Sequence, residues 1–171
     1  DSNSSTSTIS IIPSNDAPAF SGAGGTLNYT ENDGDITIDS SLTITDLDHT
    51  EIESAYIEIS SGFLSSEDTL GFINTSDITG SWNSSLGLLS LSGSASLADY
   101  ESALESITYT NSSDNPSNTS RTISWSVNDG STDSNSSTST ISIIPSNDAP
   151  AFSGAGGTLN YTENDGDITI D

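Results

Sequence analysis

Oxygen-bearing side chains gather in short turns along this chain, and their types and spacing suit the binding of a hard cation. One turn carries two alternating aspartates, Asp46 and Asp48, and another reads Asn128-Asp129-Gly130. Carboxylates, amides and backbone carbonyls are the ligands of Ca²⁺, which takes about six to eight oxygens in irregular geometry. The same residue types are also what turns require, so each acid taken singly is explained equally well as an ordinary turn residue.

The charge balance favours cation binding over most other functions. The 171 residues include 25 acids, one arginine (Arg121), no lysine and one histidine (His49), for a net charge of −24. Such a surface attracts cations and repels nucleic acids and anionic membranes. Cysteine is absent, which excludes disulfides and thiolate metal sites, and no segment approaches the roughly 20 apolar residues of a membrane span. We therefore predict no nucleic-acid partner and no direct membrane insertion.

Enzymatic activity is not expected from these residue types. A Ser-His-Asp triad would have to use His49, and a single histidine among turn acids is better explained as an exposed turn residue. The chain also lacks the lysine that Schiff-base chemistry or a Lys-Asn cross-link would need. We predict that the protein is not an enzyme.

Two copies of one segment organise the chain. Residues 1–39 return letter for letter as residues 133–171, and each copy contains Ile-Ile-Pro-Ser-Asn-Asp-Ala-Pro. An apolar strand end followed by two prolines around Asn-Asp is typical of a junction between domains. We predict that residues 1–16 are the last strand of a preceding repeat plus linker, 17–148 a complete repeat, and 149–171 the first strands of the next. Because isolated hairpins are marginal, neighbouring copies are expected to order both tails.

The complete repeat is predicted to be all-β. Apolar residues alternate along several short segments, which places one face of each strand in a core that includes Trp82 and Trp125. The segment Ser96–Ile107 instead has helical spacing, with Ser96 and Asp99 spaced as in a capping box. Glu67-Asp68 is expected to be a pair of solvated loop acids. These patterns indicate an antiparallel β-sandwich of immunoglobulin type with one short helix.

Strands that run alternately up and down place acids at both ends of this sandwich. The first strand starts from the incoming linker, so the turns before the third and last strands return to the linker's end. The turn after the first strand lies at the opposite end, beside the outgoing linker. We predict metal ligands at the first end from Asn15, Asp16, Asp46, Asp48, Asp129 and Asp133, at the second from Glu31, Asp33, Asn147 and Asp148, and in the next repeat from Glu163 and Asp165.

These motifs together resemble a known family. The segment Tyr29-Thr30-Glu31-Asn32-Asp33, the pair Asp46-x-Asp48, Val127-Asn128-Asp129-Gly130 and the Asn-Asp-Ala-Pro junction are similar to cadherin-like tandem repeats of giant bacterial surface adhesins, many of the repeats-in-toxin class. The resemblance covers the whole repeat. It has no clear counterpart of the cadherin Asp-Arg-Glu motif, and the glycine-rich nonapeptide of the toxin-type β-roll is also absent.

The resemblance implies a cadherin-like sandwich and a role as a calcium-stiffened extender. Cadherins bind calcium between domains with a Glu at the end of the first strand, an Asp-x-Asp pair and a linker Asn-Asp. The positions that match this pattern are Glu31, Asp46, Asp48, Asn15, Asp16, Asn147 and Asp148.

We therefore expect a structural extender repeat of a long extracellular adhesin or surface filament. Its expected partners are identical repeats joined head to tail, its ion is Ca²⁺, and its setting is the cell surface, where adhesion and biofilm formation take place. The alternative is a glycan- or protein-binding β-sandwich module that uses Trp82, Tyr56 or the polar loops.

Eight asparagines satisfy the N-x-S/T acceptor pattern of N-glycosylation, in a chain rich enough in Ser and Thr to produce several by chance. They would carry glycans in a host that has the machinery, and they are Asn3, Asn28, Asn74, Asn83, Asn111, Asn118, Asn135 and Asn160.

Overall fold

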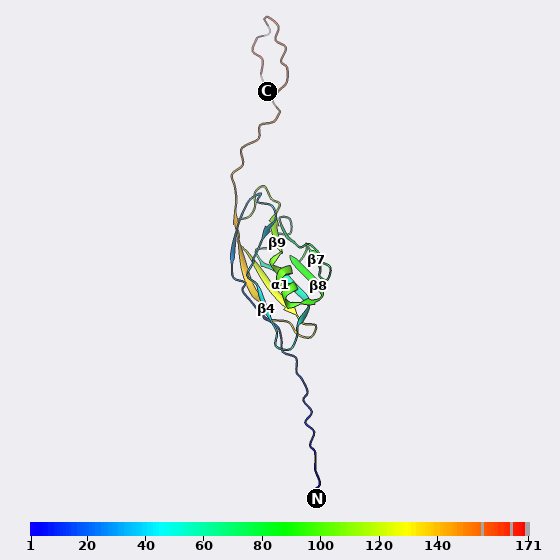
Figure 1. The fold of residues 1–171 in the computed structure, drawn as a ribbon. Coiled ribbons are helices and arrows are strands. Elements are labelled where there is room, and N and C mark those ends of the chain that lie inside the picture. Colours follow the sequence, from blue (N-terminus) through cyan, green and yellow to red (C-terminus); the bar gives the residue numbers. More distant parts are fainter. Residues whose placement is uncertain (155, 165, 170–171) are drawn as a thin grey trace.

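The computed structural model describes residues 1–154, 156–164 and 166–169. A compact body lies between two tails that leave it at opposite ends (Figure 1). Residues 1–18 and the described residues after Ile144 form neither helix nor strand. No helix in the described part of the chain is long and apolar enough to cross a membrane.

The body is built on a six-stranded sheet. Adjacent strands of this sheet run antiparallel, except for one parallel pair formed by the first two strands in the order that follows. In spatial order the strands are β2 (Thr26–Thr30), β11 (Ser137–Ile144), β10 (Arg121–Asn128), β5 (Glu51–Ser61), β8 (Leu88–Ser96) and β7 (Thr79–Asn83).

Two smaller sheets complete the architecture. One has the order β3 (Ile36–Thr37), β9 (Thr108–Asn111) and β6 (Asp68–Gly71), and the other pairs β1 (Ala19–Ser21) with β4 (Thr43–Thr45). Buried apolar residues from all three sheets, including Phe20, Tyr109 and Trp125, form one hydrophobic core. The fold is an all-β sandwich with one short helix, as predicted.

The first strand is divided between two sheets. β1 pairs with β4, whereas β2, which follows after four residues, pairs with β11. Gly22 lies in this connection with a φ of 89°, and a Cβ there would stand 1.9 Å from the carbonyl oxygen of Ser41. Only glycine tolerates that conformation and that close approach, so the glycine-rich break lets the chain change sheets.

The predicted alternation is confirmed in the central strands. Along β5, Ala55, Ile57 and Ile59 are buried while Tyr56 and Glu58 are exposed. The two tryptophans differ, because Trp125 is fully buried in β10 whereas Trp82, on the edge strand β7, is half-buried against the ring of Phe63.

The helix also matches its prediction. α1 spans Leu97–Glu105, and the Ser96 hydroxyl accepts a hydrogen bond from the Asp99 N–H at 3.1 Å as its N-cap. Tyr100 is buried on its inner face, and burial raises the pKa of its hydroxyl to about 12. Glu101 accepts the backbone N–H of Ile44 at 2.7 Å, which ties the helix to β4.

The prediction that Glu67 and Asp68 are solvated is wrong for Asp68. This residue is 2% exposed, and its carboxylate receives Nε of Arg121 at 3.0 Å and Nη2 at 3.1 Å. The hydroxyl of Tyr109 donates to the same carboxylate at 2.6 Å, and burial together with this bond raises the pKa of Tyr109. Arg121, itself 0% exposed, also contacts Glu67 at 3.3 Å. The one arginine of the chain thus pairs with buried acid inside the core rather than on the surface.

The strand predicted within residues 1–16, as part of a preceding repeat, is absent from the described structure. Residues 5–12 have the same letters as Ser137–Ile144, which is β11 between β10 and β2, but they pair with no strand in the described part of the chain. A strand needs a partner for its backbone hydrogen bonds, and the N-terminal copy has none here.

Candidate metal-binding sites at the two poles

The incoming linker is docked onto one end of the sandwich, which we call the entry pole. The side-chain amide of Asn15 donates to Oδ2 of Asp129 at 3.0 Å and to the hydroxyl of Thr132 at 3.2 Å. The backbone N–H of Asp16 lies 3.3 Å from both carboxylate oxygens of Asp48. The linker and two separate turns therefore meet at this pole, as the alternation of strand directions predicted.

Two aspartates at the entry pole use one carboxylate oxygen to brace their own turns. Oδ1 of Asp46 accepts the backbone N–H groups of Asp48 at 3.0 Å and His49 at 2.9 Å. Oδ1 of Asp129 accepts those of Ser131 and Thr132, both at 2.7 Å. Such side-chain to backbone bonds are what make aspartate favourable in turns. They also hold the two carboxylates in place and leave their second oxygens for other partners.

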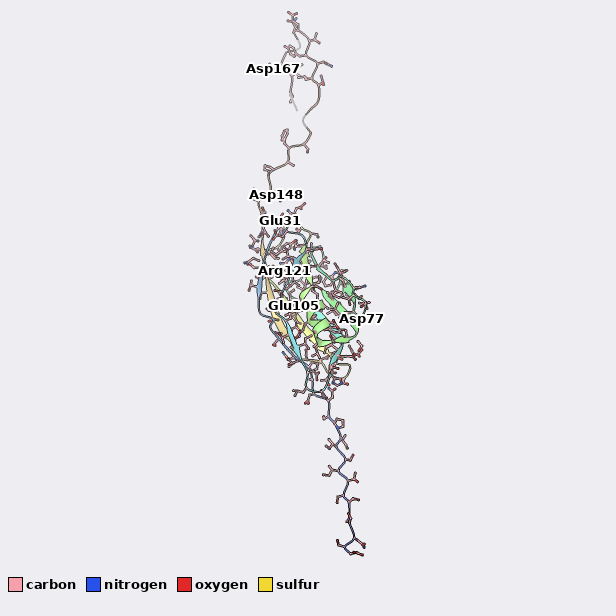
Figure 2. The ribbon with its side chains drawn as sticks, viewed as in Figure 1. Glu31, Asp77, Glu105, Arg121, Asp148 and Asp167 are labelled. Atoms are coloured by element: carbon pink, nitrogen blue, oxygen red, sulfur yellow. The ribbon has the colours of Figure 1, made fainter. Side chains whose placement is uncertain are left out.

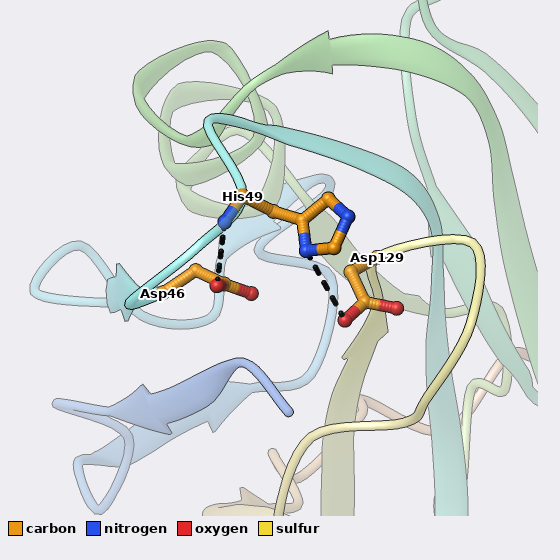
Figure 3. Close-up of side chains that lie close together, drawn as sticks. All are labelled: Asp46, His49 and Asp129. Atoms are coloured by element: carbon orange, nitrogen blue, oxygen red, sulfur yellow. Dashed lines mark hydrogen bonds and ion pairs between the residues drawn. The ribbon is translucent and has the colours of Figure 1, made fainter. Parts of the chain in front are cut away.

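A cluster of three potential ligands results. One ligand atom each from Asp46, His49 and Asp129 lies within 4.8 Å of the other two (Figure 3). Oδ2 of Asp46 and Nδ1 of His49 are buried atoms without a hydrogen-bond partner in the described structure. An unpaired buried polar atom costs about 1–3 kcal/mol, and a bound cation would remove that cost for the carboxylate oxygen. The donor set thus fits a cation.

Both aspartates of the cluster are held in the charged form. Burial raises the pKa of Asp46, but the backbone hydrogen bonds from Asp48 and His49 outweigh it, so this pKa lies below the ordinary value. Burial likewise raises the pKa of Asp129, but the hydrogen bonds from Thr132, Asn15 and Ser131 together outweigh burial, so this pKa also lies below its ordinary value. Both carboxylates are therefore ionised at neutral pH and available to a metal.

His49 is half-buried rather than the fully exposed turn residue that the sequence suggested. Its side chain is 38% exposed, and Nδ1 lies 3.4 Å from Oδ1 of Asp48 and 3.9 Å from Oδ2 of Asp129. The imidazole therefore stands among the predicted metal ligands. The one signal in the sequence that could have identified His49 as a potential ligand is its position three residues after Asp46.

Asp133, the remaining candidate at this pole, lies apart from the cluster. It is exposed and accepts the side-chain amide of Asn128 at 2.6 Å, next to an isolated β-bridge between the same two residues. Its observed contact is thus one that closes the turn before β11.

The opposite end, the exit pole, holds the outgoing linker. Glu31 is 6% exposed, and its Oε2 accepts the backbone N–H of Ser146 at 2.8 Å. Its own backbone N–H donates to the carbonyl of Ile144 at 3.0 Å. Oε1 of Glu31 is a buried atom without a hydrogen-bond partner in the described structure. Figure 2 shows Glu31 and Asp148 at the end of the body from which the C-terminal tail leaves.

The other candidates at the exit pole are exposed. Oδ2 of Asp33 accepts the backbone N–H of Thr30 at 2.7 Å and so braces the turn after β2. The Asn147 amide donates to the carbonyl of Asp148 at 3.1 Å, and the Asn15 amide makes the same bond to the carbonyl of Asp16 at 3.1 Å. Both linkers thus make the same local contact. The first is docked on the sandwich through Asn15 and Asp16, whereas the second is docked through Ser146.

The last two predicted ligands belong to the C-terminal tail. Glu163 is exposed and lies outside any strand, and Asp165 lies outside the described residues.

Comparison with known proteins gives one similarity. No family model and no solved structure matches the chain. The chain is 38% identical over 117 residues to halomucin from Haloquadratum walsbyi, an alignment that covers 66% of this chain. The aligned segment is 1% of halomucin, so the chain corresponds to a very small part of a very long protein. The resemblance to cadherin-like adhesin repeats stays a prediction.

Proposed function

We propose that this chain is a structural repeat of a long extracellular surface protein, in which Ca²⁺ stiffens the junctions between successive repeats. The similarity to a short stretch of halomucin supports a place in a very long surface protein. The letter-for-letter return of residues 1–39 as residues 133–171 supports head-to-tail repeats as the immediate partners.

The docking of one linker sequence at both poles carries the proposal. Asn15 and Asp16 contact Asp129 and Asp48 at the entry pole. At the exit pole the identical linker is held through Ser146, one residue before the counterpart of Asn15. From Ser146 to the counterpart of Asp16 is two residues, at most about 7 Å of extended chain. In consecutive repeats, the unpaired oxygen of Glu31 would therefore face the entry-pole carboxylates of the next repeat.

Calcium is the cation that this donor set favours. The available atoms are carboxylate oxygens of Asp46, Asp48, Asp129 and Glu31 together with linker oxygens, and Ca²⁺ accepts such mixed oxygen ligands in irregular geometry. Magnesium demands stricter octahedral geometry. The imidazole of His49 is a ligand that zinc would use and calcium would not, so zinc is the competitor to test.

The protein's own residues would make the joint stiff. Asn15 and Asp16 position the linker on the turns of the following repeat, and Glu31 fixes the linker on the preceding one. Bound Ca²⁺ would supply positive charge that cancels repulsion among these carboxylates. Without that charge, the acids on either side of the linker repel one another and the joint becomes a hinge.

Small-angle X-ray scattering of a protein of three consecutive repeats tests this function. With calcium we expect an extended, rigid particle, and a chelator should reduce its maximum dimension and broaden the conformational ensemble. The matched control carries Glu31→Gln in every repeat, which keeps the bond from Ser146 but removes the charge. Scattering that is unchanged by calcium removal would refute the stiffening role.

The alternative, a glycan- or protein-binding module, has less support. Trp125 is buried and Trp82 is half-buried, so neither presents a full ring face to a ligand. Roles in adhesion, biofilms or filaments would belong to the complete protein, for which this repeat would act as a spacer.

A further inference from the structure

The N-x-S/T asparagines are the one sequence motif that metal binding leaves unexplained. An acceptor asparagine must present its side-chain amide nitrogen to an enzyme, so it has to be exposed and free of hydrogen bonds through that nitrogen. Six of the eight motifs lie in the body between Ala19 and Ile144. The other two, Asn3 and Asn160, are repeats of Asn135 and Asn28 in the tails.

Three motifs of the body have the identical sequence Asn-Ser-Ser, at Asn83, Asn111 and Asn135. A difference in their reactivity therefore does not come from the three letters of the motif itself. These three sites provide a comparison that is already matched for local sequence.

Asn111 is closed to modification. It is 5% exposed, and its amide nitrogen donates to Oδ1 of Asp68 at 3.0 Å and to Oε2 of Glu67 at 3.3 Å. Its backbone N–H donates to the hydroxyl of Tyr29 at 3.1 Å. A glycan on this nitrogen would remove these bonds and could not fit beside Arg121, so a folded molecule cannot carry one.

Asn135 is occupied in a different way. Its amide nitrogen donates to the backbone carbonyl of Phe20 at 2.8 Å, and its Oδ1 accepts the backbone N–H of Phe20 at 2.9 Å. The side chain thus substitutes for a strand neighbour of β1. Modification of the nitrogen would break this two-bond contact with a buried residue.

Asn83 is open. It is exposed in the hairpin between β7 and β8, and its Oδ1 accepts the backbone N–H groups of Ser85 at 3.0 Å and Leu86 at 3.2 Å. Its amide nitrogen has no acceptor among the described residues. The hairpin therefore holds the asparagine in a fixed conformation with the reactive nitrogen turned to solvent.

In three further motifs the asparagine is also exposed and its amide nitrogen makes no hydrogen bond within the described structure. Asn74 is exposed and uses only Oδ1, which accepts the backbone N–H of Gly80 at 2.8 Å. Asn28 and Asn118 are exposed, and their side chains make no hydrogen bond within the described structure.

Two of the four open sites lie on the edge strands of the six-stranded sheet. Asn28 is within β2 and Asn83 ends β7, and these are the two edge strands. Exposed edges invite pairing with other chains, and proteins often block them with lysine, which this chain lacks.

We propose that the folded repeat carries N-linked glycans on Asn28, Asn74, Asn83 and Asn118, while Asn111 and Asn135 remain bare. The donor would be an oligosaccharide linked through its C1 to a lipid phosphate. The amide nitrogen bonds to C1, the C1–O bond to phosphate breaks, and the amide proton leaves with the lipid phosphate. The proposal rests on the extracellular location proposed above but is independent of calcium.

Peptide mapping of the protein purified from its native host tests the assignment. Trypsin would cut only at Arg121, so digestion uses a protease specific for acidic residues, of which the chain has 25. Mass spectrometry should find glycopeptides at the open sites and unmodified peptides at Asn111 and Asn135. A glycan on Asn111 or Asn135, or bare asparagine at all four open sites, would overturn the proposal. Bare sites on a protein recovered outside the cell would leave the proposed location intact.

Two serine variants made in the same host provide the matched comparison. Ser85→Ala and Ser113→Ala each destroy an Asn-Ser-Ser motif while keeping the asparagine and the backbone N–H that binds it. Ser85→Ala should lower the intact mass by one glycan, and Ser113→Ala should change it only by the substitution. Equal losses from both variants would contradict the structural distinction.

Discussion

The side-chain amide of Asn15 donates a hydrogen bond to Oδ2 of Asp129 at 3.0 Å, across 114 positions of the chain. This contact fastens the linker to the turn that precedes the last strand. The same carboxylate belongs to the cluster with Asp46 and His49. A change in the cluster's charge should therefore affect both metal binding and the position of the linker.

Asp129→Asn should weaken calcium binding by about tenfold or more, since charge count sets calcium affinity. The substitution keeps an oxygen for the N–H groups of Ser131 and Thr132, so the turn should survive and thermal stability without calcium should change little. Calorimetric titration measures the affinity. Asp114→Asn, in an exposed loop, is the control, and equal affinities for the two variants would remove Asp129 from the proposed site.

His49→Ala should separate calcium from zinc. Calcium takes oxygen ligands, so its affinity should change by less than about threefold, whereas zinc prefers imidazole nitrogen and should lose about tenfold or more. Titrations with each ion on the wild type and the variant make the comparison. If His49→Ala abolished calcium binding as strongly as Asp129→Asn, the oxygen-only site would be wrong.

Arg121→Met should destabilise the fold by about 3–5 kcal/mol, because it leaves the buried carboxylate of Asp68 without its charged partner. Urea unfolding gives the free energy. Glu67→Gln removes a weaker contact at 3.3 Å, made by a side chain that is 17% exposed, and should cost about 1 kcal/mol or less. If both variants lost a similar free energy of unfolding, burial would not be what makes the Arg121–Asp68 pair the stronger of the two contacts.

Asp39→Asn tests a pH-dependent contribution to stability. Burial raises the pKa of Asp39, but hydrogen bonds from Ser139 and Ser41 outweigh it and lower this pKa below its ordinary value of 3.8. A carboxylate with a depressed folded-state pKa stabilises the fold above its unfolded pKa, and this stabilisation is lost as pH falls through the folded pKa. At neutral pH the free energy of unfolding of the wild type should exceed that of the variant by about 1 kcal/mol.

That difference should shrink below about pH 4, where the unfolded carboxyl begins to take up its proton. Denaturant unfolding of both proteins across this range measures it. The exposed Asp114→Asn should show no comparable trend, and a gap for Asp39→Asn that stays constant down to pH 3, roughly one unit lower, would argue against the lowered pKa.

The alternation of strand directions was enough to predict which turns meet at each pole. It correctly placed Asp48 and Asp129 with Asn15, and Glu31 with the outgoing linker. It missed the burial of Asp68, although the signal was present: Arg121 shares the parity of Ile123 and Trp125 and so faces the core. A cation facing the core requires a buried acid, but sequence order alone does not show which acid lies within reach.

The duplicated segment separates what the sequence determines from what the tertiary structure determines. The alternation, the turns and the Asn-Asp junction are identical in both copies, so the sequence by itself determined which faces are apolar and where the chain can turn. Yet Ile141 in β11 is 0% exposed, while its counterpart Ile9 is 87% exposed. Tyr29 in β2 is 0% exposed, and its counterpart Tyr161 is 62% exposed.

Only the tertiary structure decided between these outcomes. β11 receives its backbone hydrogen bonds from β10 and from β2, which begins more than a hundred residues earlier in the chain. Residues 5–12 have the same letters and no such neighbours in the described structure. A strand's pairing and burial are supplied by distant segments, so an identical sequence becomes a core strand in one place and an extended tail in the other.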